Sequence, residues 1–364
     1  MRILFDCRYV VRSGHHDGIS RYSARLVEAL GRRMPVEMLI SDEAQLTLLP
    51  DLPWHLVSAE TSLREPWIAR QLNPLNPDAV FSPLQTMGSA GRRYGLVLTL
   101  HDLIYHRHRT PPRNLPWYIR IGWWAYHLTW IPQRKALNRP DEVVTVSETT
   151  KALITEHRLT LRPVTVVRNA ADPIADNPPA RRPGPDRNLV YMGSFMPYKN
   201  VSTLARALHE LPGYRLHLLS RVPANERSRL EALAPPASLE FHNGVSDAEY
   251  AELLEKAHAL VHASLDEGFG IPLVEAMSVG TPIVVSDIPI FREIGGEAGV
   301  YADPRDPTAF ASAVRTLNDA AAWKKASTAA RVQAQLFDWN RSADVLYEVL
   351  RRVAQKPRPE DAEG

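Results

Sequence analysis

Two glutamates in the second half of the chain, Glu267 and Glu275, enclose a glycine-rich segment that reads EGFGIPLVE. The segment follows a β-like run and opens a helical one. Glycines allow backbone N–H groups to approach a ligand closely, and the first turn of a helix offers unsatisfied N–H groups to an anion. Carboxylates accept paired hydrogen bonds from vicinal hydroxyls. The segment therefore predicts a site for a phosphate flanked by polyhydroxylated groups; an ordinary strand-to-helix turn with two solvated glutamates is the alternative.

A lysine, Lys199, is the second residue with a chemical interpretation. It lies in the loop GSFMPYKN, which follows a β-like run at 189–192. In open parallel sheets ligands bind outside the carboxyl ends of the strands, so a lysine in such a loop is well placed to neutralise a diphosphate. By itself the lysine is weak support, because most lysines in loops are solvated.

Short β-like runs alternate with longer helical stretches along the first half of the chain. Strands are expected at 2–6, 36–40, 79–81, 96–100 and 143–146, and a first helix at about 19–32. Strands that alternate with helices predict parallel sheets covered by helices on both faces, which is the α/β class.

A proline-rich stretch divides the chain, because residues 172–188 hold five prolines and almost no apolar residues. The pattern then restarts, with strands expected at 189–192, 215–219, 259–263 and 283–286 and helices at 201–208, 246–258, 272–279, 308–317 and 339–353. We predict an N-terminal domain over 1–172, a linker over 173–188, a second domain over 189–338, a C-terminal helix over 339–355 and a disordered tail over 356–364. A cleft between the two domains is the expected binding place.

The composition excludes several classes of protein. The 364 residues include 43 basic and 41 acidic side chains, so the net charge of +2 argues against a protein that coats nucleic acid. The single cysteine, Cys7, excludes an internal disulfide and a cysteine-based zinc site. We see no signal peptide and no run of 18 or more apolar residues. A cytoplasmic protein is expected, with a peripheral position at the inner face of the membrane as a variant.

The motifs occur together in an order that resembles the fourth, retaining family of glycosyltransferases. They are the Glu-x7-Glu segment with its internal Gly-Phe-Gly, the Gly-x5-Lys-Asn loop and a Gly-Ile-x-Arg-Tyr that begins at Gly18. Within this family the chain most resembles the mannosyltransferase-like branch, over about 1–354. The resemblance implies the GT-B fold, in which two Rossmann-like domains face each other across a cleft and the C-terminal helix crosses back to the N-terminal domain.

The resemblance also implies roles for particular residues. Glu267, Lys199 and His101 would be the catalytic residues: Glu267 contacts the donor sugar, Lys199 balances the charge of the leaving phosphate, and His101 contacts the donor hexose. Glu275 would bind the ribose. The donor-binding residues would be Gly18, Ser147, Gly193, Gly268, Phe269, Gly270, Ile271 and Glu275, with Arg221 as a further candidate.

One feature departs from the family pattern. The family usually places an arginine in the lysine loop, but this chain has Ser194 and Tyr198 at the two usual places. Arg221, after the predicted strand at 215–219, is a candidate to replace it. Altered donor geometry, slower turnover or lost activity are the possible consequences.

The resemblance implies a reaction that needs no metal and no cofactor. The sequence contains no Asp-x-Asp, in agreement with that expectation. The co-substrate would be a nucleotide-diphosphate sugar, with GDP-mannose as the first expectation and UDP-sugars as the alternative. The acceptor would be a glycan or a lipid-linked acceptor in polysaccharide or glycolipid biosynthesis, and the expected route is a front-face transfer that retains the anomeric configuration.

Three other functions compete with a transferase. A nucleotide-sugar or carbohydrate-binding protein without turnover would reuse the fold without its chemistry. A sugar-nucleotide isomerase needs acid and base carboxylates that we cannot place. A nicotinamide dehydrogenase needs Gly-x-Gly-x-x-Gly after the first strand, which the segment 14–18 does not supply.

Two weaker features also have alternative interpretations. Residues 105–135 hold four tryptophans among six basic residues, which suits a membrane surface or an acceptor site, although a helix that buries its aromatics is the commoner reason for such a pattern. His15, His16 and Asp17 are adjacent side chains that do not easily converge on one ion, so we interpret them as a loop and not as a metal site.

Overall fold

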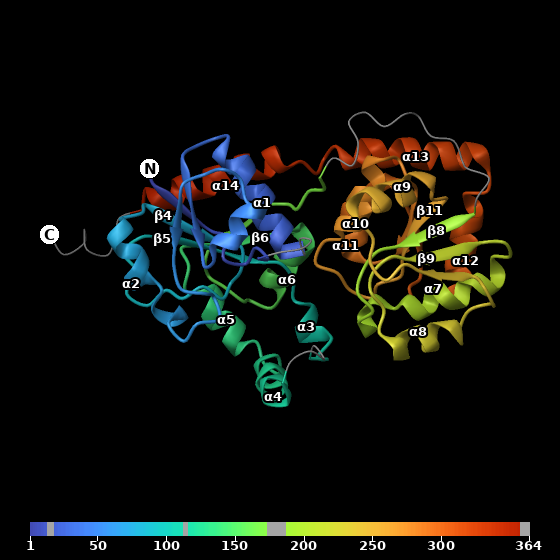
Figure 1. The fold of residues 1–364 in the computed structure, drawn as a ribbon, viewed down its shortest axis with the longest axis horizontal. Coiled ribbons are helices and arrows are strands. Elements are labelled where there is room, and N and C mark those ends of the chain that lie inside the picture. The colour runs from blue at the N-terminus through green and yellow to red at the C-terminus, as the bar shows by residue number, and fades with distance from the viewer. Residues whose placement is uncertain (13–17, 112–115, 173–186, 357–364) are drawn as a thin grey trace. The chain divides into compact units, whose positions relative to one another are not determined.

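The chain folds into two compact units in a computed structural model that describes residues 1–12, 18–111, 116–172 and 187–356. The first unit comprises Met1–Ala170 together with the C-terminal segment from Asp338, and the second comprises Ala171–Phe337 (Figure 1). Each unit is a parallel sheet with helices packed on it, as the alternating pattern predicts. Most of the predicted linker and nearly all of the predicted tail lie outside the described residues.

The first unit is built on a seven-stranded parallel sheet with the order β3-β2-β1-β4-β5-β6-β7. The strands are β1 (Ile3–Asp6), β2 (Val36–Ile40), β3 (Trp54–Leu56), β4 (Ala79–Ser82), β5 (Gly95–Leu100), β6 (Glu142–Thr145) and β7 (Val164–Val166). The five predicted strands are present, each within one residue of the expected bounds. The prediction missed β3 and β7 because these three-residue edge strands are only partly buried and carry little hydrophobic signal.

The first unit also contains helices. They are α1 (Gly18–Gly31), α2 (Ala69–Leu72), α3 (Ile104–Arg107), α4 (Trp117–Tyr126), α5 (Ile131–Leu137), α6 (Glu148–Glu156) and α14 (Trp339–Ala354), with short 3-10 turns η1 (Glu43–Leu48), η2 (Glu65–Trp67) and η3 (Asn73–Leu75). The C-terminal helix α14 returns to this unit and packs along α1 (Figure 1). Asp338 caps its first turn, and Ser342 Oγ donates a hydrogen bond of 2.7 Å to the carbonyl of Arg168. The expected return of the C-terminal helix is thereby confirmed.

The second unit is built on a six-stranded parallel sheet with the order β10-β9-β8-β11-β12-β13. The strands are β8 (Asn188–Tyr191), β9 (Arg215–Leu218), β10 (Leu239–Phe241), β11 (Ala259–His262), β12 (Ile283–Ser286) and β13 (Gly299–Ala302). The helices are α7 (Val201–Ala207), α8 (Ala224–Glu231), α9 (Asp247–Lys256), α10 (Ile271–Ser278), α11 (Pro289–Gly295), α12 (Pro307–Thr316) and α13 (Ala320–Ala334), with 3-10 turns η4 (Pro197–Lys199), η5 (Leu208–Glu210) and η6 (Gly296–Ala298).

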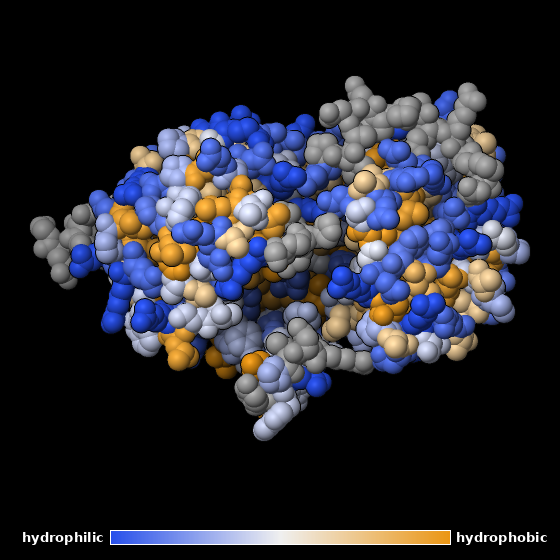
Figure 2. Space-filling view, viewed as in Figure 1, coloured by the Kyte–Doolittle hydropathy of each residue, from blue (hydrophilic) through white to orange (hydrophobic). Residues whose placement is uncertain are grey.

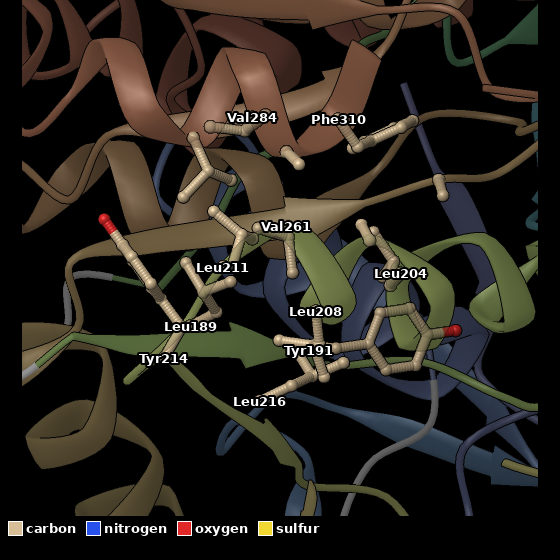
Figure 3. Packing of buried hydrophobic residues seen from close by; sticks show 14 of the residues in the cluster. Leu189, Tyr191, Leu204, Leu208, Leu211, Tyr214, Leu216, Val261, Val284 and Phe310 are labelled. Carbon is tan, nitrogen blue, oxygen red and sulfur yellow. The ribbon is translucent and has the colours of Figure 1, made fainter. Parts of the chain in front are cut away.

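An apolar core lies on one face of the second sheet. Leu189, Tyr191 and Val261 project from the strands toward Leu204 and Phe310 of the covering helices (Figure 3). Burial of each large apolar side chain contributes about 1.5–3 kcal/mol. Leu216 and Leu218 of β9 belong to this core, so the residue between them, His217, projects from the opposite face of the sheet.

Local signals predict some helices of the second unit and miss others. The predicted capping box opens α9, because Ser246 Oγ accepts from the N–H of Glu249 at 3.3 Å and Glu249 Oε2 accepts from the N–H of Ser246 at 2.8 Å. The prediction missed α13, whose buried stripe consists of small residues and one tryptophan, Trp323. It also missed α8, which buries only Leu230.

Candidate functional site

The two predicted catalytic residues of the second unit form an ion pair. Lys199 ends the turn η4 after β8, and Glu267 follows β11, the neighbouring parallel strand. Lys199 Nζ donates to Glu267 Oε1 at 2.6 Å, with only 15% and 8% of the two side chains exposed. The carboxyl ends of adjacent strands therefore bring together residues that are 68 positions apart.

Two further side chains support Glu267. Ser264 Oγ donates to Glu267 Oε1 at 2.8 Å and lies 2.9 Å from Nδ1 of His262, the last residue of β11. Burial raises the pKa of Glu267, but Lys199, the nearby His262 and the hydrogen bonds outweigh it and hold that pKa below its ordinary value. Burial lowers the pKa of His262 to about 4. The site thus holds a charged carboxylate beside a neutral imidazole at pH 7.

Sequence reasoning did not single out His262 or Ser264. Both belong to the run His262-Ala263-Ser264, which Leu265 and Asp266 separate from the EGFGIPLVE segment. In a strand that points alternate residues to one face, the spacing of two predicts that these side chains lie together. That local signal was available, but the partner of the pair, Glu267, could be assigned only from the fold of the loop.

The loop of Lys199 is held in place by its neighbour Asn200. Asn200 adopts the left-handed conformation with φ of 54°, which asparagine tolerates better than most residues. Its Nδ2 donates to the carbonyls of Ala263 at 3.0 Å and Pro304 at 2.6 Å. The N–H of Leu265 also donates to the carbonyl of Tyr198 at 2.8 Å. These bonds tie the lysine loop to the loop of Glu267 and fix their separation.

The glycine that opens the lysine loop is required by close packing. A Cβ at Gly193 would lie 2.9 Å from Tyr191 Oη and 3.4 Å from His262 Nε2. Tyr191 Oη in turn donates to the carbonyl of Ser194 at 2.6 Å. A larger residue at 193 would therefore displace the groups that line the site.

The first turn of α10 offers backbone donors, as predicted from the glycine-rich segment. Gly270 stands at its N-cap with φ of +102°, and a Cβ there would lie 3.1 Å from the ring of Phe291. The N–H groups of Phe269, Gly270 and Ile271 donate no hydrogen bond to another described residue. Donors of this kind at a helix N-terminus bind anions.

The remaining predicted residues of the second unit differ in accessibility. Glu275 lies on α10, is buried, and accepts a hydrogen bond of 2.9 Å from Tyr250 Oη of α9. Arg221 follows β9 and is exposed, as a replacement for the missing loop arginine would have to be. Its Cγ lies 3.8 Å from the position of a Cβ at Gly244. The roles of Glu275 and Arg221 toward a ligand stay predictions.

In the first unit, His101 and Ser147 are linked through one threonine. Ser147 caps α6 and accepts from the N–H of Thr150 at 3.1 Å, while Thr150 Oγ1 donates to the carbonyl of His101 at 3.3 Å. His101 Nε2 lies 2.8 Å from the carbonyl of Pro83, and burial lowers the pKa of this imidazole to about 4. His101 is therefore neutral at pH 7. Its neighbour Asp102 accepts from the N–H of Ile104 at 3.0 Å, the local role that such a residue commonly has.

The Gly-Ile-x-Arg-Tyr motif has a packing role in the structure. Its tyrosine, Tyr22, is buried on α1 with its ring edge-on to His101 at 4.9 Å and to Trp339 of α14 at 6.1 Å. Gly18 was expected in the loop before this helix, but it is the first residue of α1 and is exposed. The rest of that loop, with His15, His16 and Asp17, lies outside the described residues.

Two sequence families match adjoining parts of the chain. The family described as "Glycosyltransferase Family 4" matches residues 16–174, and the family described as "Glycosyl transferases group 1" matches residues 175–331. Together they span both units, and the second contains Lys199, Glu267 and Glu275. The chain therefore belongs to glycosyltransferase family 4, with a group 1 domain as its second unit.

Curated relatives match parts of the chain. The O-antigen chain mannosyltransferase RfbU of Salmonella typhimurium is 46% identical over 77 residues, or 21% of this chain and 22% of its own length. The O-antigen chain mannosyltransferase B of Escherichia coli is 32% identical over 160 residues, which are 41% of this chain and 42% of its own length. The glycogen synthase of Mycobacterium tuberculosis is 32% identical over 240 residues, or 60% and 56%. The chain thus spans less than two thirds of the length of each of these relatives.

Solved structures share the fold at low sequence identity. Sucrose-phosphate synthase from Thermosynechococcus elongatus matches with a TM-score of 0.72 and 18% identity, over 97% of this chain and 98% of that one. WaaG, a glycosyltransferase involved in lipopolysaccharide biosynthesis, matches with a TM-score of 0.69 and 15% identity, over 96% and 99%. HepE of Anabaena, solved with UDP-glucose, matches with a TM-score of 0.69 and 18% sequence identity. The match covers 97% of this chain and 100% of that one. The likeness confirms the GT-B fold with its two Rossmann-like domains.

A membrane-spanning helix is not found within the described part of the chain. Among those residues, none of the helices combines the length and the apolar character needed to cross a bilayer.

Proposed function

We propose that this protein is a retaining, metal-independent glycosyltransferase. It would move a hexose from a nucleotide-diphosphate sugar to a hydroxyl of a glycan or lipid-linked acceptor in polysaccharide or glycolipid biosynthesis. The observation that carries the proposal is the buried pair Lys199–Glu267 beside the N–H donors at the start of α10. The names of the curated relatives, two of them O-antigen mannosyltransferases, support the same function.

The proposed chemistry is stabilisation of the leaving diphosphate. As the anomeric bond breaks, negative charge collects on the diphosphate; Lys199 and the N–H groups of the first turn of α10 would stabilise it. Preorganised electrostatic groups of this kind usually make the largest catalytic contribution. The acceptor hydroxyl would attack the face that the diphosphate leaves, and a phosphate oxygen would take its proton, so the protein would need no separate base.

The carboxylates would orient the sugar and the ribose. Glu267 is kept charged by Lys199 and can accept hydrogen bonds from sugar hydroxyls. Glu275, the proposed ribose ligand, accepts a hydrogen bond from Tyr250. Neutral His101 remains the proposed contact to the donor hexose.

Nucleotide titration tests the donor site. We expect one of GDP, UDP and ADP to bind in the presence of a chelator, with GDP as the first expectation, and Glu275→Gln to weaken that binding at least tenfold. The glutamine variant retains an oxygen for Tyr250, so a loss reports on the ligand. Glu252→Gln, on the exposed surface of α9, is the matched control. Failure of all three nucleotides to bind would contradict the proposed site.

A product assay then separates a transferase from a binding protein without turnover. The nucleotide that binds is supplied as its sugar conjugate with a candidate glycan acceptor and a chelator, and the anomeric configuration of the product is read by NMR. Transfer with retention supports the proposal. Tight binding with no transfer to any acceptor would favour the non-catalytic alternative, for which the absence of the loop arginine at Ser194 and Tyr198 is the supporting observation.

We further propose that α4 contacts an anionic membrane surface. Three apolar side chains of α4 share one exposed helix face, with 72% of Trp117, 59% of Ile121 and 47% of Trp124 accessible. Arg120 lies beside them and lines the same surface pocket. Apolar and aromatic side chains next to arginine suit the interface of an anionic bilayer.

The aromatic stretch that contains α4 is only partly core. Trp123 packs edge-on to Tyr105 at 4.9 Å, and Trp130 stacks between His106 at 4.0 Å and His157 at 4.3 Å. These two tryptophans follow the commoner interpretation of such a pattern, whereas Trp117 and Trp124 do not. The surface view shows hydrophilic and hydrophobic side chains interspersed over the visible face of both units (Figure 2).

A further inference from the structure

Three potential metal ligands gather at the edge of the second sheet. His217 of β9 pairs directly with Glu240 of β10 in the strand register, and His242 follows Glu240 by two residues. Because side chains alternate along a strand, all three project from the same face. His217 Nδ1 lies 3.0 Å from His242 Nε2, and each of these nitrogens lies 3.8 Å from an oxygen of Glu240.

The three side chains differ in their exposure to solvent and in their neighbours. His217 is buried, with 8% of its side chain exposed. Glu240 and His242 are partly exposed, which leaves the site open to solvent. Arg215 pairs with Glu240 Oε2 at 3.2 Å, while Oε1 is the oxygen nearer to His242.

His217 Nδ1 and His242 Nε2 lie within hydrogen-bond distance at 3.0 Å, so one imidazole can donate to the other. Among the described residues, His217 Nε2 is buried with no hydrogen-bond partner. A cation bound by His217 Nδ1 and His242 Nε2 would take the place of the hydrogen bond between the two rings and leave the proton of His217 on Nε2. Two nitrogens bound to one tetrahedral zinc ion lie about 3.3 Å apart, so the observed separation is close to that of a zinc site.

We propose that His217, Glu240 and His242 bind a divalent ion of the zinc type. Two imidazoles and one carboxylate are a donor set that Zn²⁺ accepts, with water in the fourth position. The ion would tie the edge strand β10 to β9. It would also secure the loop after β10, where the N–H of Gly244 donates to the carbonyl of Leu219 at 2.8 Å. The site is separate from Lys199 and Glu267, and it adds a structural metal to a reaction proposed to need none.

Metal titration of the full-length, tag-free protein tests the site. After removal of metals with a chelator, Zn²⁺ is titrated against a chromophoric competitor, and Co²⁺ is used to record the visible spectrum of the bound ion. We expect one Zn²⁺ per chain and a tetrahedral Co²⁺ spectrum. His242→Gln and Glu240→Gln should each lower the affinity at least about tenfold. Zn²⁺ should raise the melting temperature of the parent protein and not that of His242→Gln.

Two control variants separate this site from other histidines. His55→Gln removes another His–carboxylate pair, His55 Nε2 to Glu37 Oε2 at 2.5 Å, and should leave the affinity unchanged. His15→Ala with His16→Ala removes adjacent histidines near the N-terminus and should also leave it unchanged. Loss of binding in that double variant would overturn the proposal, as would absent binding or equal binding by the parent and His242→Gln.

Folding and nucleotide binding serve as separate readouts. The side chain of His242 is partly exposed, so His242→Gln should melt at the parent temperature without metal. If His242→Gln melts below the parent without metal, the Zn²⁺ affinity of Glu240→Gln decides whether the site exists, because the side chain of Glu240 is more exposed. Nucleotide titration should be unaffected in both variants, because neither residue belongs to the proposed donor site. The metal proposal can therefore fail while the transferase proposal stands, and the reverse.

Discussion

At the scale of single residues, the site depends on charges that compensate one another. Lys199 and Glu267 neutralise each other at 2.6 Å. In the proposed reaction a diphosphate would compete for the lysine, and sugar hydroxyls would donate to the carboxylate. The same two side chains can thus stabilise each other or a ligand.

Replacing the lysine should lower catalysis and also cost stability, because Glu267 would keep a buried charge without its partner. We expect Lys199→Met to lower kcat by roughly 10²–10³, the usual cost of removing one group that stabilises developing negative charge. The partly exposed lysine stem can be replaced by methionine without a cavity. The measurement is steady-state sugar transfer, with the exposed Lys324→Met as control. Unchanged kcat in Lys199→Met would contradict the proposed role.

The histidine beneath the ion pair should make stability depend on pH. Its folded pKa of about 4 lies below the ordinary value of 6.5, so the unfolded chain binds more protons between these values. The contribution of His262 is therefore complete above pH 6.5 and is lost as the pH falls toward 4. We expect the parent to lose about 3 kcal/mol more than His262→Gln over this range, measured by urea unfolding. If the free energy of unfolding fell equally with pH in the parent and in His262→Gln, the proposed contribution of His262 would be refuted.

A buried arginine in the first unit should be essential for stability. Arg8 is fully buried and pairs with Asp6 at 2.8 Å and with Glu65 at 2.6 Å. Removal of one partner from a buried ion pair typically costs about 3–5 kcal/mol, because uncompensated charge remains. Arg8→Met should show this loss in chemical unfolding. The exposed pair of Arg33 with Asp344 is the control, and Arg33→Met should cost under about 1 kcal/mol.

At the scale of elements, the exposed face of α4 should determine membrane binding. We expect the triple variant Trp117→Ser, Ile121→Ser, Trp124→Ser to lose at least tenfold in binding to vesicles with 
anionic lipid, because it removes the apolar contact area. Trp67→Ser is the control, since Trp67 is 49% exposed in the same unit outside this helix. Co-sedimentation with vesicles is the measurement. Equal binding by the parent and the triple variant would rule out α4 as the contact.

The elements differ in how well the sequence predicts them. Strands β1 and β12 each hold a run of three consecutive apolar residues, as strands of parallel, doubly covered sheets require, so their pattern is sufficient. The short edge strands β3 and β7 lack such a run. Their assignment depends on hydrogen bonding to a neighbouring strand, which is a property of the fold and not of the local sequence.

At the scale of the whole molecule, the C-terminal helix α14 belongs to the first unit, together with the N-terminal part of the chain. Helix α14 buries Leu346, Val349, Leu350 and Val353 in that unit. Truncation after Phe337 would expose the apolar surface that these residues cover. We expect amide exchange in α1, β4 and β5 to accelerate at least tenfold, while the strands of the second unit keep their protection. Mass spectrometry of exchange measures both at once, and equal protection in the truncated and full-length first unit would contradict the expectation.

The sequence by itself determined the α/β class, the parallel strands with continuous apolar runs, the capping box at Ser246 and the loops that hold Lys199 and Glu267. These features are local, because period, capping and turn chemistry act over a few neighbouring residues. Motif order also identified the family, since three spaced motifs together are specific.

Only the tertiary structure decided which of these residues meet. The contact of Lys199 with Glu267 depends on the pairing of β8 with β11, and the meeting of His217 with His242 depends on the register of β10 on β9. The link between Ser147 and His101 likewise runs through a side chain on α6. Strand order and register arise from packing across the whole sheet, so no short stretch of sequence contains them.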